Sequence, residues 1–530
     1  MNRRLFLKSL SLLFFVPALA AFQKKINKVK FLHGVASGDP TDKRVVIWTR
    51  ITPEKFNVTK AIKYQISLQK SFKSILEHGL VFTNKRKDFT VKADINLSKY
   101  KPGTKFFYRF ICEDVISPVG ITNTLPQQDI EKYKIAIFSC SNHPAGFFNV
   151  YKDAAEDKSI DLNIHLGDYI YEYEDGGYAT EDANKLGRIP IPENEVKTLN
   201  EYRLRHSQYK TDEDLQALHQ SRPMICIWDD HEISNDAWQN GAENHQKNES
   251  NFYFRKKSAL QAYYEWMPVR EKVIKQRRWE NFKIGNLINL LILDTRLSSR
   301  DKQVMYSEYI NDGNFDKESF LKDLNKKSRS LLGNEQLNFV KQKSNKNCTW
   351  NLFGQQVLLS KVVLPPLPSF VLNELPENSK YLKYINNLNL PYNTDSWDGY
   401  PAERERFLNI LKKYSSNNVF LAGDTHNCWA ANVKNNTNNF VGVEFATPSV
   451  SSPGGSDEFK GLDVRPVEAA ITQVNKNLVW TNFRNRGYLT LELRKEFGLA
   501  SFIGVNTVKK KSFTRSILKN IYLKPGKEIT

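Results

Sequence analysis

Cysteine, histidine and methionine are scarce in this chain of 530 residues, which contains five Cys, nine His and four Met. Five cysteines are too few for a fold held together by disulfides. Nine histidines limit any metal site that is built mainly from imidazole. No apolar run after the first twenty-odd residues reaches the 18 residues of a transmembrane helix, so we expect the remainder to be soluble.

Hydrophobic residues make up 40% of the chain, with 32 Phe and 23 Tyr, which is enough for a large folded core. The formal charge is +19. Neither a zinc-finger spacing nor a basic helix interleaved with aromatic residues is present, so we expect no stable nucleic-acid partner. Attraction of anionic substrates, such as phosphate esters, explains the charge better.

Residues 1–20 have the pattern of an export signal. Arg3-Arg4 is followed by Leu-Phe-Leu-Lys, then by an apolar stretch and the small-residue motif Ala18-Leu19-Ala20. This pattern resembles the twin-arginine signal, which would make the twin-arginine export machinery a partner and the protein periplasmic or secreted. A general secretory signal or an uncleaved anchor is the alternative.

Residues 28–126 contain short runs of alternating apolar and polar residues that are separated by turn residues. The runs at 45–49, 62–68 and 105–110 are examples. This spacing predicts an N-terminal β-sandwich of the fibronectin or immunoglobulin type.

After residue 127, strand-like runs alternate with helical stretches, and five apolar runs end in titratable residues. These ends are Ser139-Cys140, Gly167-Asp168, Asp229-Asp230-His231, Asp294-Thr295-Arg296 and Gly423-Asp424-Thr425-His426. Because sites of α/β sheets form at the carboxyl ends of strands, we expect a catalytic domain over 130–505. Residues 176–200 and 300–400 are polar insertions that could cover the site, and 506–530 is expected to be a basic, loosely packed tail.

Converging strand ends of this kind could bind a pair of metal ions. Asp168 is the best-placed residue to bridge two ions, which could together hold a phosphate ester and activate water. Other hydrolases fit less well: the segment after Cys140 lacks the C/S-x-P-x-R motif of sulfatases, and none of these strand ends carries the G-x-S-x-G motif of serine hydrolases.

The order of motifs along nearly the whole chain resembles the alkaline phosphatase D (PhoD-like) metallophosphatases, within the calcineurin-like and purple acid phosphatase superfamily. The matching segments are 34–40 (GVASGDP), 48–50 (WTR), 139–140 (SC), 165–172 (HLGDYIYE), 202–206 (YRLRH), 228–232 (WDDHE), 293–296 (LDTR), 423–426 (GDTH), 443–447 (VEFAT) and 451–454 (SSPG).

The resemblance implies an α/β metallophosphatase domain, a four-layer αββα sandwich, after the N-terminal β-sandwich. It also implies one Fe³⁺ and calcium. Carried onto this sequence, the iron ligands are Cys140, Asp168, Tyr171 and His426. Asp168 would bridge to Ca²⁺, with Asp230, Asn235 and Asp424 as further calcium ligands. Thiolate and phenolate suit a ferric ion, and carboxylate and amide oxygens suit Ca²⁺.

The implied activity is hydrolysis of phosphate monoesters by a metal-activated hydroxide, with release of inorganic phosphate. Phosphodiesterase or phospholipase D-type activity on phospholipid, teichoic-acid-like or nucleic-acid diesters is the alternative, and a noncatalytic binding protein is the third. His231 is the candidate for steadying charge or protonating the leaving group. Arg296 is the candidate for binding phosphate, with Arg300 in reserve, although Arg296 could instead pair with Asp294.

Several residues near these motifs have simpler interpretations. We expect Glu232 to support a ligand rather than to be one, and His165, His206 and His219 to be structural. The spacing of the remaining cysteines leaves a disulfide among Cys112, Cys226 and Cys348 open. We expect a monomer with no membrane partner.

Overall fold

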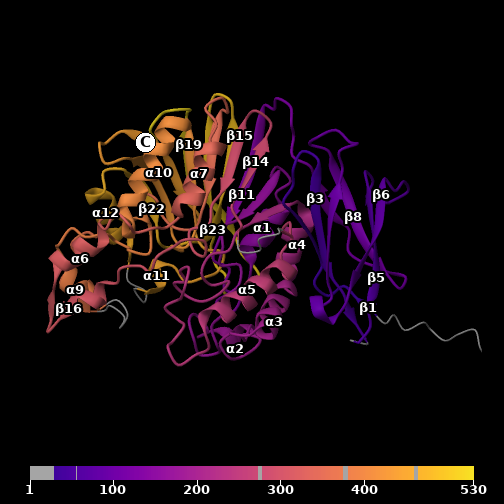
Figure 1. Cartoon of the computed structure of the whole chain (residues 1–530), viewed down its shortest axis with the longest axis horizontal. Coiled ribbons are helices and arrows are strands. Elements are labelled where there is room, and N and C mark those ends of the chain that lie inside the picture. The colour runs from indigo at the N-terminus through magenta and orange to yellow at the C-terminus, as the bar shows by residue number, and fades with distance from the viewer. Residues whose placement is uncertain (1–28, 55–56, 272–276, 374–379, 459–462) are drawn as a thin grey trace, which may run out of the picture.

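The computed structural model describes residues 29–54, 57–271, 277–373, 380–458 and 463–530. The predicted export signal therefore lies outside the described residues. The N-terminal region forms one end of the molecule, and two large sheets with their helices form the rest (Figure 1). The predicted order, a β domain followed by an α/β domain, is confirmed.

The N-terminal domain is the expected sandwich of antiparallel strands. Its outer sheet consists of β10 (Gly120–Asn123), β8 (Lys105–Cys112), β5 (Lys60–Ser67) and β6 (Glu77–Thr83), with β9 (Val115–Ile116) at the end of β8. A short pair, β1 (Val29–Lys30) and β4 (Thr52–Pro53), lies beside it. Ile62 and Phe106 of the outer sheet share a buried cluster with Val45 and Ile47 of the inner one, as alternation along a strand requires.

The inner sheet of the sandwich belongs equally to the catalytic domain. It is one end of a nine-stranded sheet: β25 (Arg515–Leu523), β24 (Gly498–Val505), β23 (Arg486–Arg494), β11 (Lys132–Phe138), β12 (Leu162–His165), β13 (Met224–Cys226), β2 (Val35–Gly38), β3 (Arg44–Arg50) and β7 (Thr90–Asn96). The junction is the parallel pairing of Met224 with Gly38. Next to it, the buried guanidinium of Arg278 donates to Asp39 at 2.5 Å.

The close approach of the two domains requires glycine at position 38. A Cβ there would lie 2.3 Å from the carbonyl oxygen of Pro268 and 2.5 Å from that of Met224. We expect Gly38→Ala to lower the free energy of unfolding by about 1–3 kcal/mol, because the backbone must shift to admit the methyl group. Thermal or denaturant unfolding measures this. Gly177→Ala is the control, because its φ lies outside the left-handed region and the nearest heavy atom to its Cβ would be 3.1 Å away; an equal effect at both positions would contradict the steric explanation.

A second sheet of seven strands faces the first. Its order is β14 (Glu280–Ile284), β15 (Ile288–Ile292), β18 (Trp350–Gly354), β19 (Asn418–Ala422), β21 (Phe440–Ala446), β20 (Cys428–Lys434) and β22 (Leu478–Asn482). Leu290 and Leu421 share the central core with Ile137 and Ile164 of the first sheet. The adjacent residue Leu291 instead packs in a second cluster on the opposite face, since side chains alternate along a strand.

Helices cover the outer faces of both sheets and complete the four layers (Figure 1). Those packed on the first sheet include α1 (Asn149–Glu156) and α4 (Glu213–Ser221), and those on the second include α7 (Gly333–Lys343) and α10 (Pro401–Tyr414). The other long helices are α3 (Leu199–Lys210), α5 (Phe252–Trp266), α6 (Lys317–Leu324) and α12 (Arg465–Val474). Short helices are α2 (Ala183–Leu186), α8 (Ser369–Asn373), α9 (Leu382–Ile385) and α11 (Gly455–Glu458).

Two regions differ from the sequence-based expectations. Residues 300–400 include a small lobe with its own apolar core, where β16 (Ile310–Asn311) pairs with β17 (Asn314–Phe315). The expectation of a loosely packed tail over 506–530 is wrong, because β25 pairs with β24 along its length. Apolar and polar residues alternate only weakly along β25, because it is an edge strand and most of its residues are exposed.

All five cysteines lie in the described part of the chain, are buried, and carry free thiols, so none forms a disulfide. Among the described residues, no helix has the length and apolar character needed to cross a membrane.

Candidate active site

The carboxyl ends of strands from both large sheets meet and bring the predicted ligands together. Three overlapping groups of potential ligand atoms result, with the atoms of each group within 4.8 Å of one another. They are Cys140, Asp168 and His426; Asp168, Asp230 and His231; and Asp229, Asp230 and Asp424. Asp168 and Asp230 each belong to two groups, so the three form one continuous cluster.

The backbone at four of these residues is in the left-handed region, which costs energy for a residue other than glycine. The φ angles are 61° at Cys140, 53° at Asp168, 61° at Asp424 and 59° at His426. Such conformations collect at functional sites, where surrounding contacts hold them in place. Here they turn the chain sharply directly after buried strands.

The first group contains a thiol, a carboxyl group and an imidazole, and the phenol of Tyr171 lies beside them. The hydroxyl of Tyr171 donates to Asp168 Oδ2 at 3.1 Å and lies 3.1 Å from His426 Nε2. Ser452 Oγ in turn donates to the Tyr171 hydroxyl at 2.7 Å. Cys140, Asp168 and Tyr171 are buried. Burial, together with the charge of Asp168, raises the pKa of both the Cys140 thiol and the Tyr171 phenol well above their usual values.

A hydrogen bond fixes the tautomer of His426. Its Nδ1 lies 2.7 Å from the carbonyl oxygen of Pro453, which can only accept, so Nδ1 carries the proton. Nε2, on the side of Tyr171 and Asp168, then presents a lone pair. This is the arrangement by which proteins orient a histidine ligand for a metal ion.

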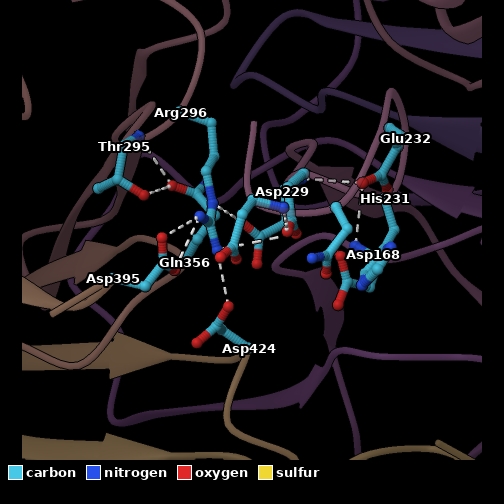
Figure 2. Close-up of polar contacts among 12 residues, drawn as sticks. Asp168, Asp229, His231, Glu232, Thr295, Arg296, Gln356, Asp395 and Asp424 are labelled. Carbon is cyan, nitrogen blue, oxygen red and sulfur yellow. Dashed lines mark hydrogen bonds and ion pairs between the residues drawn. The ribbon is translucent and has the colours of Figure 1, made fainter. Parts of the chain in front are cut away.

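The acidic end of the cluster surrounds Arg296, as Figure 2 shows. The buried guanidinium donates from Nε to Asp229, from Nη1 to Asp395 at 2.9 Å and from Nη2 to Asp424 at 2.7 Å. Its Nη2 also lies 3.7 Å from Asp230. Asp294, the alternative partner considered from the sequence, accepts the backbone N–H of Arg296 rather than a guanidinium N–H.

The arrangement gives Arg296 a role that the sequence did not predict. Three of its five N–H groups donate to carboxylates and the side chain is fully buried, so it holds acidic residues of the cluster in place. Phosphate binding by Arg296 stays a prediction. Arg300 is likewise buried and pairs with Asp395.

The cluster carries more negative charge than its cations offset. Burial raises the pKa of Asp168 and Asp229 well above the usual value, and raises that of Asp424 to about 7 even though Arg296 opposes the shift. Asp168 Oδ1 and Asp229 Oδ2 are buried and have no hydrogen-bond partner in the described structure. Buried carboxylate oxygens without donors fit metal ligation, because a cation both neutralises and satisfies them.

His231 is held by a glutamate that the sequence reasoning did not single out. Its Nδ1 lies 2.8 Å from Oε2 of the buried Glu172, and its ring stacks on Tyr171 with centroids 4.2 Å apart. Glu172 Oε1 also accepts the backbone N–H of Asn235 at 2.6 Å. Despite burial, Glu172, Asp230 and Asp168 together raise the pKa of His231 well above its usual value.

Glu172→Gln is expected to lower kcat by about 10–100-fold, because His231 loses the charged partner that orients its ring. We expect KM to change little, since Glu172 lies behind His231. Steady-state kinetics with p-nitrophenyl phosphate measures both constants. Glu174→Gln is the matched control, because Glu174 is exposed two residues further on; a similar loss in both variants would refute the positioning role.

Two further residues considered from the sequence, Glu232 and Asn235, lie near the cluster. Glu232 accepts backbone N–H groups of Asp168, Tyr169 and Asp229 at 3.0, 2.8 and 2.9 Å, so it supports the ligand loops as expected. The Asn235 side chain donates to Glu243 at 2.9 Å, and its calcium-binding role stays a prediction.

Sequence reasoning missed several residues of the cluster: Glu172, Asp229, Asp395 and Ser452. Glu172, Asp229 and Ser452 lie in the matching segments 165–172, 228–232 and 451–454. For Asp229, its place beside Asp230 at a strand end was the signal that could have identified it. Asp395 comes from the 300–400 insertion. From the 176–200 insertion, Tyr178 places its hydroxyl 3.3 Å from His426 Nδ1. Both insertions therefore reach the site.

Comparisons with known proteins find matches over most of the chain. The family model described as PhoD-like phosphatase matches residues 135–501, and that of the PhoD-like phosphatase N-terminal domain matches 17–126. The chain is 32% identical over 477 residues to "Alkaline phosphatase D" of Bacillus subtilis (strain 168), covering 87% of this chain and 75% of that protein. A solved structure titled "Structure of PhoD" aligns with a TM-score of 0.79 at 30% identity, covering 93% of this chain and 90% of that one.

Proposed function

The chain belongs to the PhoD-like phosphatase family, and on that premise we propose that it is an exported, metal-dependent alkaline phosphatase that hydrolyses phosphate monoesters and releases inorganic phosphate. As a homologue of alkaline phosphatase D, it is a phosphoric ester hydrolase. Export through the twin-arginine pathway stays a prediction from the sequence.

The observation that carries the proposal is the continuous cluster of ligand atoms with unsatisfied buried carboxylate oxygens. We propose that Cys140, Asp168, Tyr171 and His426 hold Fe³⁺. Asp168 would also bind calcium, with Asp230, Asp424 and Asn235 as further calcium ligands. Asp229 is an additional candidate calcium ligand, because it lies in one group with Asp230 and Asp424. Bound ions would supply Lewis-acid stabilisation of the phosphoryl oxygens and a lowered pKa of water.

The protein's own groups have two further tasks in this proposal. Arg296 holds Asp229, Asp395 and Asp424 in fixed positions and offsets part of their mutual repulsion. His231, whose Nδ1 is bonded to Glu172, keeps Nε2 for the reacting groups. The carboxylate of Glu172 favours the protonated imidazole, whose Nε2 proton can be donated to the leaving alkoxide or phenoxide oxygen.

A substrate panel tests this function. Purified full-length enzyme should release phosphate from p-nitrophenyl phosphate and from alkyl monoesters faster than it cleaves bis(p-nitrophenyl) phosphate. Cleavage of diesters with little action on monoesters would reject the monoesterase and support the diesterase alternative.

A further inference from the structure

A small cationic cavity lies far from the catalytic cluster, beside α10 and the end of β20. Its volume is about 250 Å³, and three basic residues and five asparagines line it. The basic residues are Arg404, Lys361 and Lys434; no carboxylate belongs to the lining. Lys434 lies six residues beyond the strand start at Cys428, so it is about 20 Å from the catalytic end of β20.

Arg404 is the buried centre of this cavity. Only 2% of its surface is exposed, yet it forms no ion pair in the described part of the chain. Its Nε donates to the carbonyl oxygen of Leu359 at 2.6 Å, and Nη2 donates to that of Lys434 at 3.3 Å. Its Nη1 is buried without a hydrogen-bond partner. A buried guanidinium that contacts neutral carbonyls and keeps one nitrogen unsatisfied can take an oxyanion as a charge-assisted partner.

The cations face one another across the cavity, and carboxylates outside its lining offset part of their charge. Burial and the proximity of Arg404 both lower the pKa of Lys361, whereas Asp398 and Glu405 oppose that shift. These acids and Glu444 also stabilise Arg404, but they lie behind the lining, where each accepts backbone N–H groups: Asp398 that of Val362, Glu444 those of Leu359 and Ser360, and Glu405 that of Asn436. Glu528 pairs with Lys434 at 3.0 Å from outside the lining.

The asparagines surround these cations with neutral polar groups. Asn436 accepts a hydrogen bond from Lys361 Nζ at 2.8 Å and thereby holds that ammonium group at the cavity. Asn435 accepts the backbone N–H of Asn439 and Thr437, which fixes the turn between β20 and β21. Side-chain amide N–H groups bind oxyanions without adding charge.

We propose that this cavity is a second anion site, which binds a small oxyanion such as phosphate or sulfate through Arg404, Lys361 and Lys434. The volume of about 250 Å³ accommodates a small oxyanion, and the distance separates the site from catalysis. An anion here would link α10, the segment after β18 and the end of β20. The proposal does not depend on the reaction at the catalytic cluster.

An experimental structure of the full chain determined in selenate locates the anion directly through its anomalous signal. We expect a selenium peak within hydrogen-bond distance of the Arg404 guanidinium. A cavity without selenate in crystals that hold the anion elsewhere would overturn the proposal.

Equilibrium dialysis with radiolabelled sulfate, and separately with radiolabelled phosphate, tests the site in solution. The double variant Lys361→Gln/Lys434→Gln should bind one oxyanion fewer per chain than wild type while keeping phosphatase activity. Both lysines reach solvent, so the variant should fold, which circular dichroism checks. Lys412→Gln/Lys413→Gln is the matched control, since it removes the same charge from exposed positions of α10. Equal stoichiometry in both double variants would overturn the assignment.

Discussion

Asp168→Asn is expected to lower kcat by about a thousandfold or more while the fold stays intact. Asp168 belongs to two of the three ligand groups, so its charge acts on both halves of the cluster. Electrostatic stabilisation by bound cations contributes several kcal/mol, and a loss of about 4 kcal/mol corresponds to this change in rate. Steady-state kinetics on p-nitrophenyl phosphate measures it.

The substitution isolates charge from backbone effects. The φ angle at position 168 is 53°, and asparagine tolerates left-handed backbone as well as aspartate does. Its amide oxygen can still accept from the Tyr171 hydroxyl. Asp398→Asn is the control, because it neutralises a buried carboxylate outside the cluster and should retain most activity. Near wild-type turnover in Asp168→Asn would disprove the bridging role.

Removal of calcium is expected to abolish activity, and added Ca²⁺ to restore it. Asp229, Asp230 and Asp424 form an oxygen-rich group, which is the donor type that Ca²⁺ prefers. Without a cation, burial raises the pKa of Asp229 and Asp424 and favours their protonated forms, which are poor ligands. Activity assays after treatment with a calcium chelator measure the effect.

The specificity of this rescue separates calcium from other divalent ions. Mg²⁺ demands near-octahedral geometry and retains its waters, so it should restore activity poorly at equal concentration. Activity that is indifferent to chelation would reject the calcium role. The Asp424→Asn variant should require more Ca²⁺ for half-maximal rescue than wild type.

Much of the site could be predicted because its residues follow strands with strong apolar patterns. Buried strands such as β12 and β19 are recognisable as short apolar runs, and the polar residues directly after them have to lie at the sheet edge. Cys140, Asp168, Asp424 and His426 meet for this reason. Their sequence separation does not matter, because topology brings the strand ends together.

Other contacts could not be predicted because they depend on tertiary geometry. The sequence shows Arg296 two residues after Asp294, but only the folded structure shows that its side chain reaches Asp229, Asp395 and Asp424. Asp395 lies in an irregular insertion with no periodic signal. The sequence also does not reveal that the two domains share one sheet, since a single residue pair, Met224 with Gly38, joins their strands.

Metal analysis combined with absorption spectroscopy of the active enzyme decides whether this cluster holds iron and calcium together. We expect one iron and at least one calcium per chain, and a visible absorption band from charge transfer to Fe³⁺ that Tyr171→Phe weakens. A colourless, iron-free preparation with full phosphatase activity would rule out the iron site.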